Sequence, residues 1–235
     1  MKILAIETSL AACSAAFVQG DTPLAHRFEV IGRGHGEALI PMIEAARVQA
    51  GIEFADLDLI AVSVGPGTFT GVRVGVATAR ALALAAHVPT RGFVSLEILA
   101  AGAVQSGAVP AGTGVTAVFD ARRGEVYHQT FGPDLVAATP PALNTLEDAA
   151  RLTPPVTGVL VGTGAGLLHG HLTNLGKPWT VADGPDQPDA RVLAALATKA
   201  ANDGLQPPAP GLDHPVRPLY IRPPDAKLPG DRGGN

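Results

Sequence analysis

A glycine-rich stretch at residues 65–71 is the strongest candidate for binding chemistry. It reads Gly-Pro-Gly-Thr-Phe-Thr-Gly and lies between a short β-branched run and a long alanine-rich run, an order typical of a buried strand, a loop and a helix. The N–H groups of such a loop, together with the helix dipole, favour a phosphate. The stretch lacks the Gly-Lys-Ser/Thr ending of a Walker A loop, and its third glycine falls one position late for the dinucleotide fingerprint. A tight turn with close helix packing is therefore favoured, and phosphate binding is the alternative.

Two further segments have the form of nucleotide-binding turns. Residues 162–166 read Gly-Thr-Gly-Ala-Gly after an apolar run, but no acidic residue follows at the distance that a ribose requires. Glu7 ends the first strand-like segment, where actin-like and sugar-kinase-like ATPases carry an acid and a glycine turn. Here Leu10, Ala11 and Ala12 fill that turn instead. A structural remnant is favoured over an active phosphate hairpin.

The histidines do not form a metal-binding pattern. His35 opens a predicted helix, and a second ligand would be needed one turn later, at position 39, which is Leu39. His169 and His171 alternate with glycines and have no nearby carboxylate in the sequence, so a solvated loop is predicted there. We expect no metal site and no catalytic residue.

The arginines of the long apolar helix need partners. Arg73 and Arg80 are seven residues apart and hence on one helix face. A carboxylate of the same chain (Asp120, Glu125 or Glu97) and a partner molecule or phosphate are the two alternatives. Residues 120–127 are dense in charge for a hairpin, so they form either a salt-bridged turn or a contact at a domain junction or partner.

Small residues recur at every fourth position along the same segment: Gly67, Gly71, Gly75, Ala79 and Ala83. On a helix this spacing forms one stripe without bulk, which allows another backbone to approach closely. Together with Gly65, the glycines are assigned a structural role in the loop and the stripe.

The expected elements predict an α/β protein with mixed sheets. Strands are predicted at 2–6, 13–18, 24–30, 57–64, 91–94, 114–120, 125–131 and 156–161, and helices at 37–50, 72–88, 95–105 (capped by Ser95), 145–152 and 189–202. A small-residue linker at 106–112 divides the chain into residues 1–105 and 106–235, the latter with a proline-rich tail expected to fray after Lys227. The two strand–glycine loop–helix units suggest related halves.

The helix at 37–50 is apolar on more than one side. Leu39, Ile43 and Ala46 form a core face, while Ile40 and Val48 lie on other sides. Either a partner chain or the rest of this chain must cover the second side.

Composition excludes several classes of protein. The 235 residues carry a net charge of −4 with no basic stripe, so binding nucleic acid alone is not expected. The single Cys13 cannot form an internal disulfide. Met1 runs directly into a strand-like segment with no leader pattern, and the apolar helix at 72–88, with its two arginines, is expected to be too short and too charged for a bilayer. We expect a soluble cytoplasmic protein with no membrane association.

Several motifs resemble the TsaB (YeaZ) family. They are residues 3–9 with Cys13-Ser14, residues 35–43, the block 65–75, the hairpin 120–127 and the segment 218–222. The resemblance implies an ASKHA (actin-like and sugar-kinase-like) fold of two lobes, each with a mixed sheet and helices. It also implies a non-catalytic relative of TsaD, the enzyme that makes threonylcarbamoyladenosine at position 37 of tRNA and holds its metal with a His-x-x-x-His pair. The second histidine is missing here at Leu39.

The resemblance further implies partners and no cofactor. The expected partner is a TsaD-like protein in a heterodimer, joined by a TsaE-like ATPase, with tRNA bound only through the complex and a homodimer through the same surface as a second assembly. The remaining alternatives are an ATP-binding ASKHA enzyme and an inactive metallopeptidase-like homologue. By resemblance and by apolar pattern, the partner interface is assigned to Arg33, His35, Leu39, Ile40, Ile43, Arg47, Thr70, Arg73 and Val74.

Overall fold

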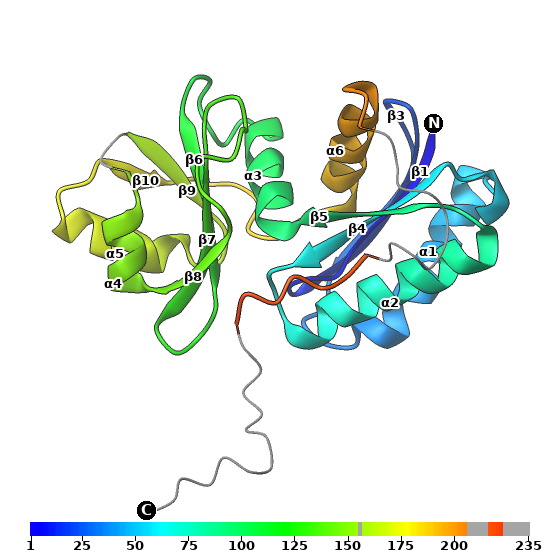
Figure 1. The fold of residues 1–235 in the computed structure, drawn as a ribbon, viewed down its shortest axis with the longest axis horizontal. Coiled ribbons are helices and arrows are strands. Elements are labelled where there is room, and N and C mark those ends of the chain that lie inside the picture. The colour runs from blue at the N-terminus through cyan, green and yellow to red at the C-terminus, as the bar shows by residue number, and fades with distance from the viewer. Residues whose placement is uncertain (155–156, 206–215, 223–235) are drawn as a thin grey trace, which may run out of the picture.

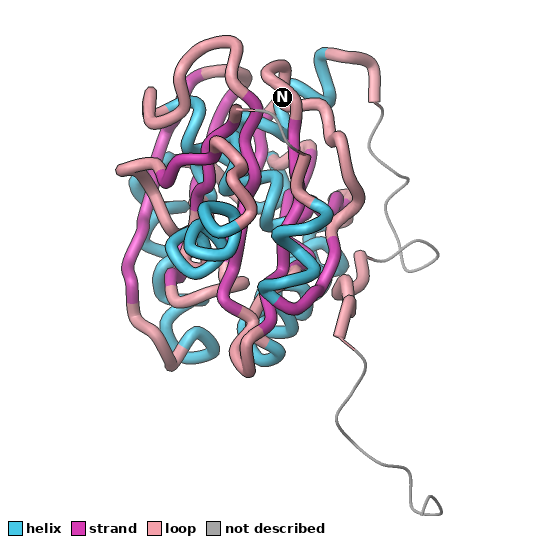
Figure 2. The backbone as a smooth tube through the Cα atoms, turned by 90° about the vertical axis from the view of Figure 1, so that its left-hand side faces the viewer, coloured by secondary structure: helices cyan, strands magenta, loops and turns pink. Residues whose placement is uncertain are grey.

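The chain forms two lobes, each built on a five-stranded mixed sheet with helices on its faces (Figure 1). The computed structural model describes residues 1–154, 157–205 and 216–222. Figure 2 shows the strands running between the helices. The predicted fold class, with two lobes that each hold a mixed sheet, is confirmed.

The first sheet has the strand order β3-β2-β1-β4-β5. Three strands form an antiparallel meander, and the last two add in parallel. Both faces of β1 and β4 are buried, as their continuous apolar runs require. The strands are β1 (Lys2–Glu7), β2 (Ala12–Gln19), β3 (Thr22–Val30), β4 (Leu59–Gly65) and β5 (Thr90–Val94). One face is covered by α1 (His35–Ala50) and α2 (Phe69–Ala86), with the short η1 (Phe54–Asp56) between α1 and β4.

The second sheet repeats this arrangement, with the order β10-β9-β6-β7-β8. Its antiparallel strands are β6 (Gly114–Asp120), β7 (Glu125–Phe131) and β8 (Ala142–Thr145), and β9 (Gly158–Val161) and β10 (Trp179–Val181) add in parallel. One face is covered by α4 (Leu146–Leu152) and α5 (Ala165–Asn174). The strand order therefore confirms two related halves.

Three elements of the second lobe were not predicted, namely β8, β10 and α5. His169 and His171 lie on α5 rather than in a solvated loop. Leu168 and Leu172 of this helix are fully buried in the core of the second lobe. Their burial stabilises the helix although its glycines have low helix propensity.

Two helices lie where the chain crosses between the lobes. After β5, α3 (Ser95–Gln105) packs between the sheets and contacts β6 and β7, and α6 (Ala190–Asn202) returns to pack on β1 and β2. The division at 105/106 stays a prediction, but the contacts of α6 associate it with the first sheet and not with the second. Ser95 is the first residue of α3 rather than its cap, and its hydroxyl donates to the carbonyl of Pro66.

Helix α2 spans 18 residues and is long and apolar enough to cross a bilayer on length and composition alone. The prediction that this segment is too short and too charged for a span is wrong in that respect. Its buried side consists of small residues and valines that pack against β4 and β1, so α2 acts as a core helix of the first lobe.

Candidate functional site

The N-terminus of α2 is closed by the turn between β1 and β2. The N–H of Thr68 donates to the carbonyl of Ser9 at 2.7 Å, and the hydroxyl of Thr8 donates to the carbonyl of Gly71 at 2.8 Å. A Cβ at Gly67 would lie 2.2 Å from the Ser9 oxygen, and a Cβ at Gly71 would lie 2.1 Å from the Thr8 oxygen. Protein carbonyls therefore occupy the place where a phosphate would bind. The contacts at Gly67 and Gly71 are as close as the packing interpretation of the stripe requires.

The other two stripe or loop glycines have separate reasons. A Cβ at Gly75 would lie 2.4 Å from the hydroxyl oxygen of Thr8, so this side of α2 is pressed onto the same turn. Gly65 has φ +99°, a backbone conformation that other residues rarely adopt.

The second glycine loop is also committed to packing. The N–H of Gly164 donates to the carbonyl of Val118 at 3.0 Å, and the hydroxyl of Thr163 accepts from the N–H of Asp120 at 3.1 Å. A Cβ at Gly162 would lie 2.5 Å from the Val118 oxygen. The loop thus seals the end of β6 in the way that the first loop seals the β1–β2 turn.

Glu7 lies inside the first lobe at 1% exposure. One carboxyl oxygen accepts from the N–H of Ser9, and the other has no hydrogen-bond partner among the described residues. Burial raises the pKa of the Glu7 carboxyl, although the N–H of Ser9 and the neighbouring Ser9 and Ser63 side chains act in the opposite direction. A buried carboxyl held toward its neutral form is a poor ligand for a cation.

The position expected to hold a metal in the enzyme relatives is filled by structural contacts. The His35 ring lies 3.2 Å from the carbonyl of Ala12, and Leu39 is completely buried in the core. Across the described ranges, no three metal-binding side chains come together. Cys13 is buried, and burial raises the pKa of its thiol to about 11.

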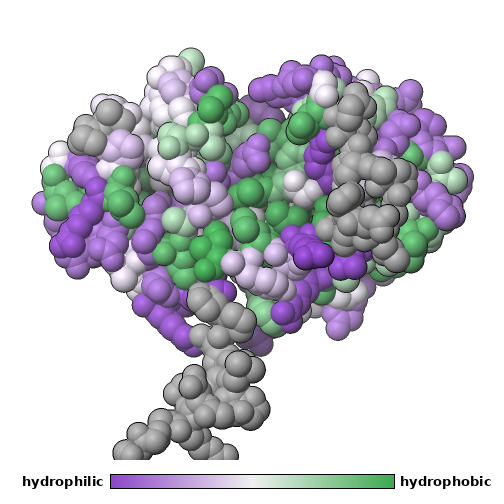
Figure 3. Space-filling view, viewed as in Figure 1, coloured by the Kyte–Doolittle hydropathy of each residue, from purple (hydrophilic) through white to green (hydrophobic). Residues whose placement is uncertain are grey.

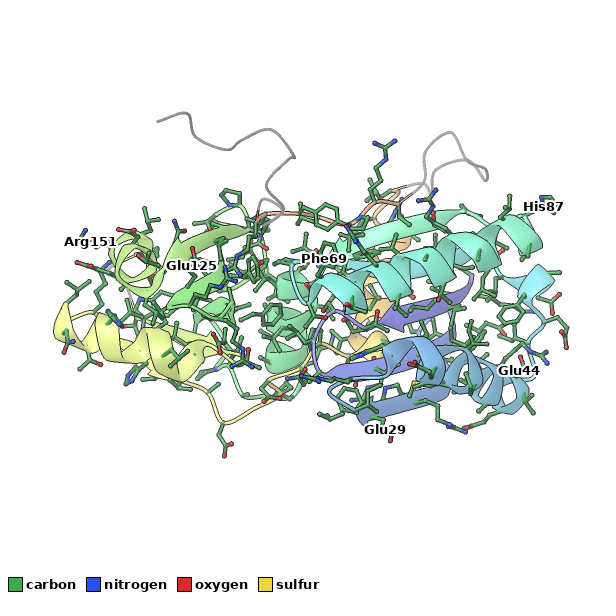
Figure 4. All side chains as sticks on the ribbon, turned by 90° about the horizontal axis from the view of Figure 1, so that it is seen from below. Glu29, Glu44, Phe69, His87, Glu125 and Arg151 are labelled. Atoms are coloured by element: carbon green, nitrogen blue, oxygen red, sulfur yellow. The ribbon has the colours of Figure 1, made fainter. Side chains whose placement is uncertain are left out.

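Helices α1 and α2 lie side by side and present large apolar side chains to solvent (Figure 4). Ile40, Val48, Phe69 and Leu84 are 51%, 66%, 58% and 55% exposed, respectively. We call these four residues the outer helical face. Apolar side chains gathered on adjacent helices are typical of an interaction surface.

The structure divides the predicted interface residues into three groups. Exposed are Arg33, Ile40, Thr70 and Arg73, whereas Arg47 and Val74 are half-buried. The side chains of His35, Leu39 and Ile43 are buried, since their spacing of four residues places them on the core side of α1. These three cannot touch a partner directly, and their assignment to the interface is corrected. Arg47 forms ion pairs with Glu44 and Glu53 of its own chain.

The predicted interface omits Phe69 and Leu84 of the outer helical face and the neighbouring Tyr220. Phe69 and Leu84 lie at helical spacing from Arg73, so the periodicity that paired Arg73 with Arg80 could have identified both. Tyr220 also lies beside Arg73, but it is too distant in sequence for any local pattern to reveal it.

A cleft of about 830 Å³ lies between the lobes, lined by residues of both and by residues 219–222. Figure 3 shows apolar side chains gathered in the region where the lobes meet. Arg73 faces this cleft, and its Nε donates to the Tyr220 hydroxyl at 2.7 Å. The described partner of Arg73 is therefore not one of the three carboxylates that were expected.

The charged hairpin fits both of its predicted roles. Arg122 pairs with Asp120 at 3.0 Å within the turn. Glu125 pairs with Arg222, which lies nearly one hundred residues later in the chain. The hairpin is thus both a salt-bridged turn and a junction with the C-terminal segment.

Comparison with known proteins gives matches along the chain. The model of the TsaD family, described as tRNA N6-adenosine threonylcarbamoyltransferase, matches residues 29–162. The tRNA threonylcarbamoyladenosine biosynthesis protein TsaB of Escherichia coli is 40% identical over 134 residues, which are 57% of this chain and 56% of that protein. The chain thus aligns with little more than half the length of this curated relative.

Solved structures extend the similarity to most of the chain. A protein of Pseudomonas aeruginosa, described as similar to peptidase YEAZ, superimposes with a TM-score of 0.80 at 30% identity, covering 94% of this chain and 99% of that one. The Lmo2764 protein of Listeria monocytogenes, described as an N-acetylmannosamine kinase candidate, superimposes with a TM-score of 0.51 at 12% identity over 86% of this chain and 100% of that one. The latter similarity shows the fold alone, which is the ASKHA fold.

Proposed function

Because the chain belongs to the TsaB (YeaZ) family, we propose that it is a non-catalytic scaffold that activates a TsaD-like enzyme in forming N6-threonylcarbamoyladenosine at position 37 of tRNA. The family has a part in the biosynthesis of this modified nucleoside. The scaffold role and the partner are our proposal.

One observation carries the proposal: the first lobe packs its glycine loop against its own β1–β2 turn and leaves its outer helical face uncovered. Thr8 and Ser9 place backbone carbonyls at the N-terminus of α2. Ile40 and Leu84, by contrast, are about half exposed on neighbouring helices. Burying such side chains against a partner would contribute about 25 cal/mol for each Å² of apolar surface removed from water.

The rest of the proposed assembly rests on the resemblance to the family. A TsaE-like ATPase would join the heterodimer, and tRNA would be bound only through the complex, in line with the net charge of −4. Two copies of this chain could pair through the same helices, in competition with the TsaD-like partner. The complex would be cytoplasmic, since its tRNA substrate is.

Reconstitution tests the proposal directly. We expect tRNA modification when the TsaD-like enzyme, the TsaE-like ATPase and this chain are combined, and none when this chain is left out. The chain alone should modify no tRNA. Full modification without it, or modification by it alone, would overturn the scaffold role.

Variants of the outer helical face locate the interface. A glutamate at Ile40 or at Leu84 places a charge where apolar surface must be desolvated, so each should weaken partner binding at least about tenfold. Leu152→Glu is the matched control, because Leu152 is 63% exposed on α4 of the other lobe. Affinities from titration calorimetry, with melting temperatures as the check on folding, decide the result. If all three variants bind the partner with equal affinity, the interface does not include the outer helical face.

The cleft between the lobes favours a second candidate function, an ATP-binding enzyme. Its volume of about 830 Å³ is large enough for a nucleotide. Its two glycine loops, however, use their N–H groups within the protein at Thr68 and Gly164. Measurable ATP turnover by the isolated chain would favour this candidate over the scaffold.

A further inference from the structure

We propose that Arg73 anchors a carboxylate side chain of the partner protein and that the segment Val216–Arg222 holds the guanidinium in place for it. The inference rests on the proposed function, because it names the chemistry by which that partner is recognised. In this proposal Tyr220 is a positioning residue, which orients the guanidinium of Arg73.

The guanidinium of Arg73 is held between two aromatic rings. Its carbon lies 3.4 Å from the ring centroid of Phe69 and 5.4 Å from that of Tyr220. The two ring centroids are 6.2 Å apart. Stacking of this kind, together with the hydrogen bond from Nε to the Tyr220 hydroxyl, restricts the side chain to one orientation.

The outward end of this guanidinium has no acceptor in the part of the chain that the structure describes. The recorded hydrogen bond uses Nε alone, and the described residues place no carboxylate at ion-pair distance from Arg73. A planar guanidinium with its two terminal nitrogens available matches a carboxylate by two parallel hydrogen bonds. The chemistry of the complementary group is therefore acidic.

The segment 216–222 is fixed at both ends of Tyr220. The N–H of Leu219 donates to the carbonyl of Val64 at 2.7 Å, and Val216 is buried in the core of the first lobe. On the other side, Arg222 pairs with Glu125 and stacks on Tyr127 of the second lobe. Tyr220 thus reaches Arg73 from a backbone that is attached to both lobes.

The surroundings favour a protein carboxylate over a free anion. Phe69 and Tyr220 are 58% and 53% exposed, so an apolar rim surrounds the charge, as in the centre of a protein interface. Arg73 lies on the same outward side of α2 as Leu84. Figure 4 shows Phe69 at the end of α2 that faces the second lobe. Arg73 therefore lies between the outer helical face and the cleft.

Affinity for the TsaD-like partner tests the anchor. Arg73→Ala should weaken binding about tenfold or more, and Arg73→Lys should recover only part of this loss, since an ammonium lacks the fork and stacks poorly. The control is Arg151→Ala, because Arg151 is an exposed, ion-paired arginine on α4. The wild-type affinity should fall with added salt more steeply than that of Arg73→Ala.

A double-mutant cycle tests the positioning role of Tyr220. Tyr220→Phe keeps the ring and removes the acceptor for Nε, and should weaken binding about threefold. In the Arg73→Ala background the same change should have no effect, because nothing remains to be positioned. If Tyr220 only supports the fold, Tyr220→Phe should reduce the affinity by the same factor in both backgrounds and should lower the melting temperature in each.

Three outcomes would overturn the inference. They are an Arg73→Ala affinity equal to that of Arg151→Ala, an additive cycle, and nucleotide binding by the isolated chain that Arg73→Ala abolishes. If the wild-type chain fails to bind the partner at all, the proposed function itself fails. If glutamate at Ile40 or Leu84 abolishes binding while the Arg73 and Tyr220 variants do not, only this inference fails.

Discussion

At the residue scale, Glu7 shows how a feature of nucleotide-binding relatives persists in an altered setting. It ends the first strand, where an acid is expected, yet its carboxyl is buried and one oxygen has no described partner. The hydroxyl oxygens of Ser9 and Ser63 are likewise buried without described partners. A charged carboxylate in this setting costs folding free energy.

The first prediction concerns the pH dependence of stability. Burial raises the folded-state pKa of Glu7 above its unfolded value, so the folded chain binds this proton more tightly. The associated stability is fully present below the unfolded pKa, about 4.3, and is lost as pH rises through the folded pKa. Glu7→Gln should therefore be more stable than wild type at pH 7.5, with a difference that shrinks toward pH 4.

Urea unfolding of both proteins across this pH range measures the effect. The amide of the variant can donate to the hydroxyl oxygen of Ser9 or Ser63. If the stability difference between Glu7→Gln and wild type is the same at every pH, folding does not shift the pKa of Glu7, and the interpretation is wrong.

At the element scale, α2 is defined by what its glycines touch. The nearest atoms to a Cβ at Gly67 and Gly71 are backbone carbonyl oxygens, which cannot rotate away, whereas at Gly75 the nearest atom belongs to the Thr8 side chain. The helix and the β1–β2 turn are therefore one packed unit, and Phe69 and Leu84 on the outer side of α2 stay exposed.

The substitution Gly71→Ala should push α2 away from the β1–β2 turn. Its methyl group would meet the Thr8 carbonyl, and the resulting shift of helix or turn should destabilise the first lobe by about 3 kcal/mol. Gly166 in α5 is the matched control, because a Cβ there meets nothing within 4 Å. Gly166→Ala should be neutral or stabilising by up to about 1 kcal/mol. Chemical unfolding measures both, and equal stabilities would contradict close packing at Gly71.

Much at this scale could be predicted from sequence, and the failures have physical causes. The four-residue spacing of glycines in α2 predicted close backbone contact, although it could not say that the contact was the Thr8–Ser9 turn. Helix α5 was missed because its local propensity is low, and its stability comes from burial of Leu168 and Leu172. On α1, periodicity identified the core face, yet it could not show that burial removes Leu39 from the partner surface.

At the scale of the whole molecule, the described chain crosses between the lobes in three places: at α3, in the connection 182–189 that leads to α6, and in the segment 216–222. Figure 1 shows the last of these crossing from the first lobe to the second. Its attachments to Val64 and Glu125 are one hydrogen bond and one ion pair. The spacing of the lobes therefore depends on few contacts at this edge of the cleft.

Loss of the ion pair between Arg222 and Glu125 should allow the distance between the lobes to vary more widely. Arg222→Ala removes the charge pairing with Glu125, and the distribution of distances between labels on the two lobes should become wider. Cysteines introduced at Val48 and Leu175, which are both exposed, would carry spin labels. The native Cys13 should stay unlabelled, because it is buried and its thiol pKa is raised to about 11.

The matched control is Arg151→Ala, which removes an ion pair within a single helix of the second lobe. Its distance distribution should equal that of the wild type. If Arg222→Ala gives the same distribution as this control, the segment does not hold the lobes, and α3 and α6 must suffice.

The return of α6 to the first sheet also sets an order of events during synthesis. The strands of the second sheet all lie within residues 114–181, so that lobe is complete before α6 has been made. The first sheet, although translated earlier, has one face covered only in part, by α3, until residues 190–202 have left the ribosome. At about 5–20 residues per second the interval after β5 lasts several seconds. The lobe that begins the polypeptide is thus the last to finish folding.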